Sequence, residues 1–328
     1  MITVLCGDIG GTKTRLAIAN VEGANVGIAR EAEFKSAAYD AFETLLAEFL
    51  QGSHAPVHAA FGVAGPVQGR VAKITNLPWV IDADSLAARF GFDLCTLLND
   101  LEATAYGLPA LAEGDLLTLQ AGAIDAAGNK AVIAAGTGLG EAGLYWDGNA
   151  HRPYATEGGH ASFSPADELE FALLRHLQRS FAHVSWERVV SGMGIVNLHG
   201  FLREYRNAPA PDWLQQQMQQ GDAAAAISIA AQTGRDELCV ETMARFVRLY
   251  GAEAGNLALK TMCSGGLYVG GGIAPKILPQ LKSGAFIEAF LSKGRMRQLL
   301  EAMQVKVILN DKAALYGPAL CAFRLAGR

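Results

Sequence analysis

Charged residues are scarce in this sequence, and long apolar runs are absent. Asp, Glu, Lys and Arg make up only 18% of the 328 residues, whereas ordinary soluble domains hold roughly 25%. The net charge is −5 at pH 7, which argues against a nucleic-acid-binding protein, because such proteins carry a basic patch. No apolar run reaches the roughly 18 residues of a membrane-spanning helix, and no signal-peptide pattern opens the sequence. We therefore expect a cytoplasmic protein that binds neither nucleic acid nor membrane.

Cysteine is also scarce, and its spacing excludes the usual cysteine-based sites. The 5 cysteines form no C-x-x-C pair, and an odd number suits neither a closed set of disulfides nor a zinc cluster. Two of them stand in apolar runs, and we interpret these as ordinary core residues. The cysteines are Cys6, Cys95, Cys239, Cys263 and Cys321.

What the sequence has in quantity is hydrophobic residues, which make up 51% of the chain. At roughly 150 residues per domain, the length fits two domains, each with its own core. Strand-like and helical patterns alternate, which favours an α/β fold with two sheets. We predict strands at 2–6, 16–19, 57–63, 71–74, 94–98, 131–135, 143–146, 267–269 and 305–309. We predict helices at 39–50, from Asp84 or Ser85 to Phe90, and at 101–106, 168–179, 223–231, 237–262 and 312–324.

A glycine-rich bend, Asp8-Ile9-Gly10-Gly11-Thr12, separates the first two predicted strands. Glycine lets the backbone approach a phosphate closely, and the backbone N–H groups and the Thr12 hydroxyl are donors for phosphate oxygens. Asp8 is suitably placed to hold Mg²⁺ through water, since such sites combine one or two carboxylates with substrate phosphates. The alternative is a plain hairpin in which Asp8 only forms the turn.

A second glycine-rich bend, Gly136-Thr137-Gly138-Leu139-Gly140, lies between the predicted strands at 131–135 and 143–146. It repeats the first pattern of strand, bend and strand, which indicates a structural duplication. Gly138, Gly140 and Gly143 also match G-x-G-x-x-G, but that dinucleotide motif requires a helix to begin at the glycines. Turn residues at 147–149 follow instead, so we reject the dinucleotide interpretation.

A third close approach of backbone to a ligand is indicated at Gly270-Gly271-Gly272, after the predicted strand at 267–269. The alternative is a flexible turn between a strand and a helix.

Asn99 and Asp100 end a predicted buried strand, where a rigid element presents polar side chains. Phosphoryl transfer to an alcohol needs a base that accepts the hydroxyl proton, and Asp100 suits that role while Asn99 orients the substrate. Both residues also favour helix N-caps, and the two roles are compatible.

Glu157 and His160 stand on a glycine-rich turn, and Glu187 stands at the start of a predicted short helix. Carboxylates and imidazole bind sugar hydroxyls. Metal binding by Glu157 and His160 is a competing function, but no third ligand with suitable spacing is evident. A solvated loop, and a glutamate that complements the helix dipole, are the alternatives.

With these residues identified, the chain resembles the bacterial glucokinases of the hexokinase and actin-like ATPase superfamily along nearly its whole length. The order of the motifs makes the resemblance specific. They are Gly7-Asp8-Ile9-Gly10-Gly11-Thr12-x-x-Arg15, Asn99-Asp100, Gly136-Thr137-Gly138-Leu139-Gly140, Glu157-Gly158-Gly159-His160, Glu187-Arg188-Val189-Val190-Ser191-Gly192 and Gly270-Gly271-Gly272-Ile273.

The resemblance implies ATP-dependent phosphorylation of glucose at its 6-hydroxyl, with Asp100 as catalytic base and Mg²⁺ held by Asp8 through water. It implies a two-domain actin-like ATPase fold, a duplicated ribonuclease H-like fold with a cleft between the domains, and a homodimer. The small domain would be 1–110, joined by a C-terminal helix at about 311–328, and the large domain 111–310. The implied glucose ligands are Asn99, Glu157, His160 and Glu187. The implied nucleotide-binding residues are Gly7, Asp8, Ile9, Gly10, Gly11, Thr12, Gly136, Thr137, Gly138, Gly271 and Gly272.

Two departures from the family pattern are visible. The cysteine-rich zinc motif of the related repressor and kinase branch is missing, so the chain resembles the zinc-free branch. Glu141 stands where a small or apolar residue is expected. We expect it either to weaken binding of the nucleotide phosphates or to point into solvent.

Three other functions stay open from the sequence. A kinase for mannose, fructose or an N-acetylated sugar would use the same motifs, and polyphosphate in place of ATP is also open. A sugar-sensing regulator would need a DNA-binding helix-turn-helix ahead of the first bend, whereas only six residues precede Gly7. A non-catalytic actin-like ATPase should lack the combined set of Asn99, Asp100, Glu157 and His160.

Overall fold

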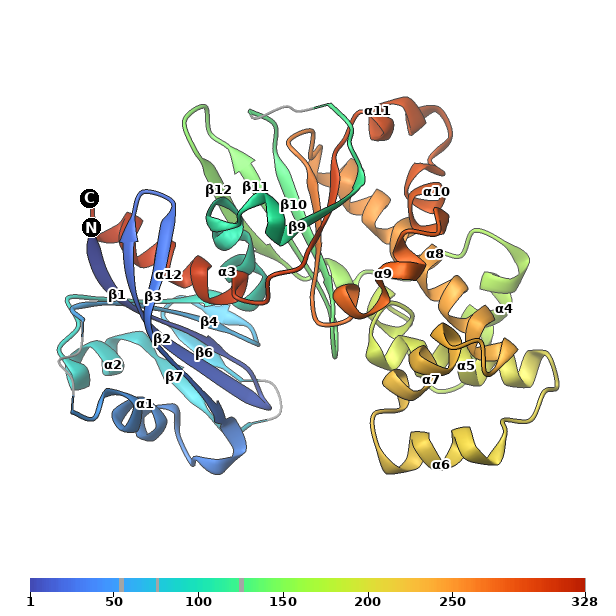
Figure 1. Cartoon of the computed structure of the whole chain (residues 1–328), viewed down its shortest axis with the longest axis horizontal. Coiled ribbons are helices and arrows are strands. Elements are labelled where there is room, and N and C mark those ends of the chain that lie inside the picture. The colour runs from blue at the N-terminus through green and yellow to red at the C-terminus, as the bar shows by residue number, and fades with distance from the viewer. Residues whose placement is uncertain (53–55, 75–76, 124–126, 328) are drawn as a thin grey trace. The chain divides into compact units, whose positions relative to one another are not determined.

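The computed structural model describes residues 1–52, 56–74, 77–123 and 127–327, which form two compact units (Figure 1). The first unit holds Met1–Asp115, Arg152–Ala155 and Asn310–Arg328, and the second holds Leu116–His151 and Thr156–Leu309. The expected domain boundaries, at 110/111 and 310/311, stay a prediction. Among the described residues, no helix has both the length and the apolar character that crossing a membrane requires.

The first unit is built on a five-stranded sheet in the order β3-β2-β1-β4-β8. β1 pairs antiparallel with β2, and β4 and β8 continue the sheet in parallel. A three-stranded sheet of short strands, β5-β6-β7, accompanies it. The strands are β1 (Ile2–Ile9), β2 (Lys13–Glu22), β3 (Asn25–Lys35), β4 (His58–Val63), β5 (Val67–Gln68), β6 (Val71–Lys73), β7 (Val80–Asp82) and β8 (Leu94–Asn99).

Successive residues of β1 point to opposite faces of this sheet, as the pleat requires. Leu5 and Ile9 pack in a core with residues of α1 and α2 on one face, while Val4 and Cys6 pack with residues of α12 on the other (Figure 1). A helix from the far end of the chain therefore covers one face of the first sheet. The helices of this unit are α1 (Phe42–Leu50), α2 (Ala83–Phe90), α3 (Asp100–Gly107) and α12 (Ala313–Ala326).

The second sheet has six strands in the order β12-β11-β10-β13-β14-β9, and all of them except β12 lie wholly in the second unit. β10 pairs antiparallel with β11, and β13 and β14 continue in parallel. This repeats the antiparallel pair and two parallel strands of the first sheet, so the duplication predicted from the two glycine-rich bends is present. The strands are β9 (Leu116–Gln120), β10 (Lys130–Ala135), β11 (Leu139–Trp146), β12 (His151–Thr156), β13 (Leu267–Gly270) and β14 (Val305–Ile308).

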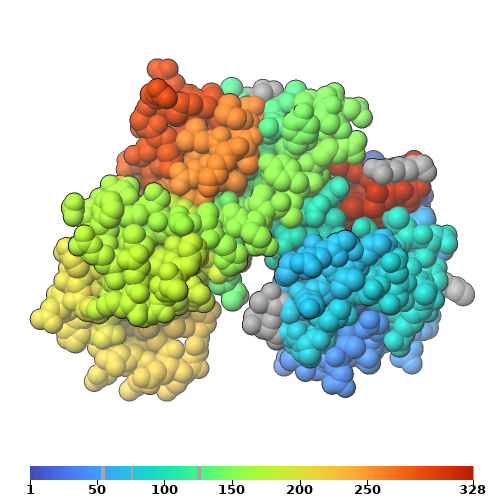
Figure 2. Space-filling view, turned by 180° about the vertical axis from the view of Figure 1, so that it is seen from behind, coloured from blue at the N-terminus to red at the C-terminus, as the bar shows by residue number. Residues whose placement is uncertain are grey.

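Helices supply most of the second unit after residue 165, as predicted. The long helix α8 lies in the core and buries Phe246, Tyr250 and Glu253 completely. Figure 2 shows the yellow helices α6 and α7 on the surface of this unit. Its helices are α4 (Glu168–Leu177), α5 (Gly192–Tyr205), α6 (Asp212–Gln220), α7 (Ala223–Gln232), α8 (Glu237–Thr261), α9 (Leu278–Leu281), α10 (Ala285–Leu291) and α11 (Arg297–Glu301). The 3-10 helices of the two units are Ser36–Ala38, Leu108–Ala110, Glu113–Asp115, Gly158–His160, Trp186–Arg188, Ala274–Ile277 and Gly294–Met296.

Most predicted elements are present, with differences at their ends. The prediction that Asp84 or Ser85 caps α2 is wrong, because Asp82 is the cap and its carboxylate accepts from the N–H groups of both residues. β11 begins at Leu139, inside the second predicted bend. All five cysteines are buried and free, in agreement with the core interpretation.

Candidate active site

Strand register places two of the predicted polar motifs at one edge of the first sheet. Ile9 of β1 is paired with Val63 of β4, and Val63 is paired with Asn99 of β8. The three parallel strands therefore end together, and the Asp8 and Asn99 segments lie two strands apart, about 10 Å by the usual strand spacing. This half of the candidate site lies wholly in the first unit.

The first glycine-rich bend is a tight hairpin between β1 and β2. The N–H group of Gly10 donates to the Lys13 carbonyl at 2.9 Å, and the Ser36 hydroxyl donates to the Gly10 carbonyl at 2.7 Å. Gly7 and Ile9 are buried within β1, so these two residues support the bend from inside the sheet. Thr12, at the tip, is exposed.

Asp8 lies beside a cation, the Arg15 side chain, near the end of the central strand β1. Its carboxylate lies 3.5 Å from an Arg15 nitrogen and keeps 28% of its side chain exposed. Arg15 also bonds the Asp311 carboxylate at 2.9 Å and the Asp311 carbonyl at 2.8 Å. Burial raises the pKa of Asp8, and the Arg15 charge opposes that rise.

Asn99 and Asp100 form the start of α3. The Asn99 side chain accepts from the N–H groups of Leu101 and Glu102, at 3.0 and 3.4 Å, and so caps the helix. One Asp100 oxygen accepts from the Leu101 N–H at 2.9 Å. The alternative interpretation as a cap is therefore correct for Asn99, and both side chains stay partly exposed at the strand end.

The second glycine-rich bend, in the second unit, is tied to the segment that carries Glu187. The Leu139 N–H donates to a Glu187 carboxylate oxygen at 3.0 Å, and the Gly192 N–H donates to the Gly136 carbonyl at 2.8 Å. Ser191 caps α5 through the Gly194 N–H. The start of α5, the positive end of its dipole, thus lies against the bend. Glu187 stands in a 3-10 helix, as expected.

The turn after β13 lies beside the same bend. Gly271 adopts φ +83°, and a Cβ there would overlap the Ala135 carbonyl, so only glycine fits. The Tyr250 hydroxyl accepts from the Ala135 N–H at 3.1 Å and lies 3.3 Å from the carbonyls of Ile133 and Gly270. Tyr250 therefore fixes the ends of β10 and β13, a role that its position in an apolar helical pattern did not reveal.

Glu157 and His160 lie together on an exposed turn of the second unit. The 3-10 helix Gly158–His160 places the Glu157 carboxylate 3.9 Å from His160 Nε2, with side chains 70% and 61% exposed. The Trp186 N–H donates to the Ala161 carbonyl at 3.0 Å. This bond joins the turn to the segment of Glu187, so the three predicted sugar ligands come from adjoining segments.

Glu141 does not point into solvent, and that expectation is wrong. It is only 1% exposed and faces Glu253 of α8. Burial, and then the charge of Glu253, raise its pKa to about 8. The residues around Glu141 in the sequence did not indicate that it would be buried beside the carboxyl group of Glu253.

Comparisons with known proteins show the family of this chain. The family model described as glucokinase matches residues 5–325. The chain belongs to the glucokinase family. A glucokinase of Trichormus variabilis is 43% identical over 99% of this chain and 100% of its own length. A glucokinase of Synechocystis is 40% identical over 98% of both.

Solved structures of glucokinases share the fold. A glucokinase from an Antarctic psychrotroph superposes with a TM-score of 0.87 at 32% identity, covering 99% of both chains. A ROK family glucokinase from Streptomyces griseus, in complex with glucose and AMPPNP, has a TM-score of 0.67 at 22% identity, covering 98% of this chain and 99% of its own. The predicted two-domain α/β fold of the actin-like ATPases is confirmed.

Asp311, a polar residue near the candidate site, was not predicted, although the sequence contains a signal for it. Leu309-Asn310-Asp311 repeats the letters of Leu98-Asn99-Asp100. Asn310 accepts from the Lys312 N–H at 2.9 Å, as Asn99 does from Leu101. Asp311, which binds Arg15, thus follows an asparagine as Asp100 does, two residues before α12 begins.

Mg²⁺ suits the first half-site by its donor chemistry. Asp8 supplies one partly exposed carboxylate beside a glycine bend, and Mg²⁺ typically takes one or two carboxylates together with substrate phosphates and water. Among the described residues, no group of three or more His, Cys, Asp or Glu side chains is placed to hold a metal ion by itself.

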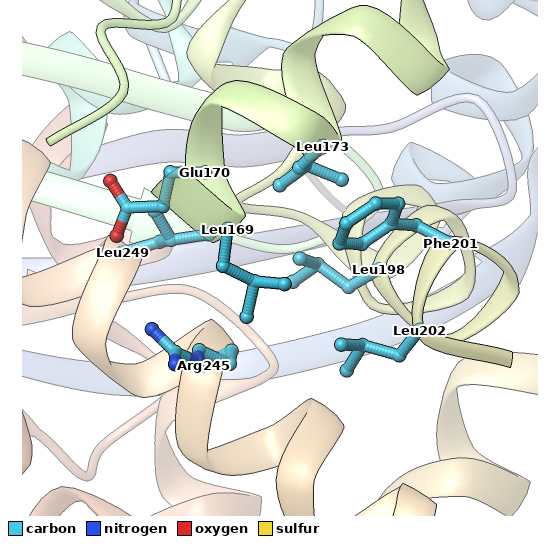
Figure 3. A pocket seen from close by; sticks show the side chains of 8 residues that line it. All are labelled: Leu169, Glu170, Leu173, Leu198, Phe201, Leu202, Arg245 and Leu249. Carbon is cyan, nitrogen blue, oxygen red and sulfur yellow. The ribbon is translucent and has the colours of Figure 1, made fainter. Parts of the chain in front are cut away.

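A small pocket lies elsewhere in the second unit. Leu173, Phe201 and neighbouring leucines of α4, α5 and α8 line it, with Glu170 and Arg245 at one side (Figure 3). Glu170 accepts from the Ala166 N–H at 2.7 Å and Arg245 bonds Asp167 at 3.1 Å. None of the candidate site residues lines this pocket.

Proposed function

We propose that this protein transfers the γ-phosphoryl group of ATP to the 6-hydroxyl of glucose, with Asp100 as general base. The observation that carries the proposal is the register Ile9–Val63–Asn99. It presents an acid at a strand end beside a glycine bend that suits phosphate, which are the two parts that phosphoryl transfer to an alcohol requires.

In the proposed reaction, Asp100 accepts the proton of the 6-hydroxyl as its oxygen attacks the γ-phosphorus. The bond between that phosphorus and the bridging oxygen breaks, and ADP leaves. Backbone N–H groups of the two bends, at Gly11–Thr12 and Thr137–Gly138, donate to phosphate oxygens. The N–H groups of Gly10 and Gly136 instead donate to the carbonyls of Lys13 and Gly138 and hold the two bends in shape. Mg²⁺, when bound near Asp8, neutralises negative charge on the phosphates.

The sugar is held in this proposal by Asn99 of the first unit and by Glu157, His160 and Glu187 of the second. Each carboxylate accepts from hydroxyls, and His160 donates or accepts a further bond. Gly271 and Gly272 are assigned to the neighbourhood of the adenosine.

Several finer expectations belong to the same proposal. They are Mg²⁺ bound through water at Asp8, a homodimer, and a cytoplasmic location. The low charge content, 18%, supports a buried subunit interface. Light scattering across a dilution series tests the dimer, and a constant monomer mass would contradict it.

The test of the reaction is ATP consumption with a panel of hexoses: glucose, mannose, fructose and an N-acetylated sugar. We expect turnover with glucose, and a fall in kcat of about 10²–10⁴-fold in Asp100→Asn, the scale of losing a general base. Asp93→Asn, at an exposed position just before β8, is the matched control and should keep full activity. An unimpaired Asp100→Asn enzyme would contradict the mechanism. Preference for another hexose would contradict glucose as the substrate.

A further inference from the structure

Glu141 is a buried carboxyl group that lies against the turn carrying Glu157 and His160. It lies in β11, two residues after Leu139, and is paired with Ile133 of β10. Burying a lone carboxylate is costly unless it is neutralised or hydrogen-bonded. Its place in the second unit therefore needs a reason beyond packing.

Both the side chain and the main chain of Glu141 hold that turn. A Cβ on Gly158 would overlap a carboxyl oxygen of Glu141, so the backbone of the turn lies directly against this side chain. The Thr156 hydroxyl donates to the Glu141 carbonyl at 2.9 Å and accepts from the Gly158 N–H at 3.2 Å. The turn is thus fixed to β11 at Glu141 from two sides.

The other side of Glu141 faces a polar cluster on α8. Glu253 is fully buried; Asn256 donates to it at 2.7 Å, and Lys260 lies 3.5 Å away. Lys293 donates to the Asn256 side chain at 2.6 Å. Lys260 and the Asn256 amide are therefore bound to Glu253, while Glu141 has neither of these bonds.

The two glutamates influence each other's protonation. Burial, followed by repulsion from Glu253, raises the pKa of Glu141, and burial also raises that of Glu253. Two carboxyl groups in contact form a hydrogen bond only when one of them carries a proton. Glu253 is bound to Lys260 and Asn256, whereas no cation among the described residues lies within bonding distance of Glu141. Burial therefore favours the uncharged form of Glu141, whose carboxyl group lies against Gly158.

We propose that Glu141 is a positioning residue, which seats the Glu157–His160 turn on β11 so that its two side chains meet the sugar. The inference rests on the proposed function, because it takes Glu157 and His160 as sugar ligands. Loss of the Glu141 proton places a second negative charge beside Glu253 and against the turn. Of the other ionisable groups around Glu141, Tyr250 and Lys260 come from α8, and Lys293 reaches the cluster through Asn256.

The experiment compares Glu141→Ala and Glu141→Gln with Glu170→Ala, a buried glutamate of the same unit that bonds the Ala166 N–H away from the turn. We expect Glu141→Ala to raise the KM for glucose by about tenfold, since displacements of about 1 Å at a site cost up to about a hundredfold. The KM for ATP should change by less than about twofold. Gln copies the uncharged carboxyl group, so Glu141→Gln should keep the wild-type KM for glucose at neutral pH. It should also abolish the rise of that KM that we expect in the wild type above about pH 8.

Hydrogen exchange of the amides of residues 156–161 is the second readout and needs no activity. We expect faster exchange there in Glu141→Ala than in Glu170→Ala. The proposal would be overturned if Glu141→Ala left the KM for glucose unchanged or raised only the KM for ATP. Unchanged hydrogen exchange in the turn of that variant would also overturn it. If Glu141→Ala does not fold, Glu141→Gln decides, and a pH profile identical to that of the wild type would overturn it. A wild-type protein inactive on every hexose would instead contradict the proposed function, and the exchange data would still test Glu141.

Discussion

The carboxylate of Glu187 accepts a hydrogen bond from the backbone N–H of Leu139, at 3.0 Å. A proposed sugar ligand is thereby attached to the bend proposed to hold phosphate. The carbonyl of Gly136 accepts from the Gly192 N–H at 2.8 Å, five residues further along the same segment. Within the second unit, the two proposed binding functions share one hydrogen-bonded framework.

We therefore predict that Glu187→Ala weakens the binding of both glucose and ATP. The variant removes a sugar ligand and frees the Leu139 N–H, so the KM values for glucose and for ATP should each rise by about tenfold. Glu168→Ala, at an exposed position in α4, is the control. Steady-state kinetics with each substrate varied in turn make the test, and an unchanged KM for ATP would refute the shared framework.

Asn99 should affect stability and sugar binding together. Asn99→Ala removes the cap of α3, which should lower the free energy of unfolding by about 1 kcal/mol. It should also raise the KM for glucose, because the same side chain is a proposed ligand. Asp82→Ala removes the cap of α2 and should cost similar stability with no change in KM. Urea unfolding and kinetics separate the two effects, and equal KM values in both variants would argue against Asn99 as a ligand.

The open glycines of the second unit test nucleotide binding without disturbing the fold. A Cβ at Gly136 or Gly272 would meet no atom within 4 Å, so each alanine variant should fold normally. In the presence of ATP the added methyl group should obstruct the nucleotide and raise its KM by about tenfold. Gly200→Ala, an equally open site in α5, is the control. Gly271→Ala should instead lower the free energy of unfolding by more than about 1 kcal/mol.

Glu141 should make stability fall as pH rises. The pKa of its carboxyl group is about 8 in the folded chain, against 4.5 for the ordinary group. Between these values the folded state holds a proton that the unfolded state has lost. The free energy of unfolding therefore falls by up to about 1.4 kcal/mol per pH unit in this window and levels off above it.

The matched variant for this pH dependence is Glu141→Gln, which has no proton to lose. Its free energy of unfolding should depend less on pH than that of the wild type, so the difference between the two should grow in favour of the variant from about pH 5 to about pH 8. Urea unfolding at a series of pH values measures this difference. Parallel curves for the two proteins would show that Glu141 does not titrate in this window.

Local patterns were enough to predict much of the fold. The glycine-rich bends, the helical spacing of residues 42–50 and the buried strand before Asn99 all follow from neighbouring residues, and the structure contains them. β3 was missed because most of its residues are exposed or half-buried, so its apolar alternation is weak. The cap of α2 was misplaced because Asp82, Asp84 and Ser85 are all suitable caps.

Relations between distant segments could not be predicted from local patterns. The register that aligns Ile9 with Asn99 depends on β4, and the burial of Glu141 depends on α8, more than a hundred residues later. Charge alone suggested that Glu141 would be solvated, whereas a partner able to share its proton makes a buried position possible.

The position of α12 has a consequence for synthesis of the protein. β1 and β2 are made first, yet Leu315 and Ala319 cover one of their faces. At about 5–20 residues per second, the ribosome needs roughly 15–60 s to pass from β2 to α12. Throughout that interval Val4, Cys6 and Ala17 have no native cover, so the first sheet exposes an apolar face until α12 has been made.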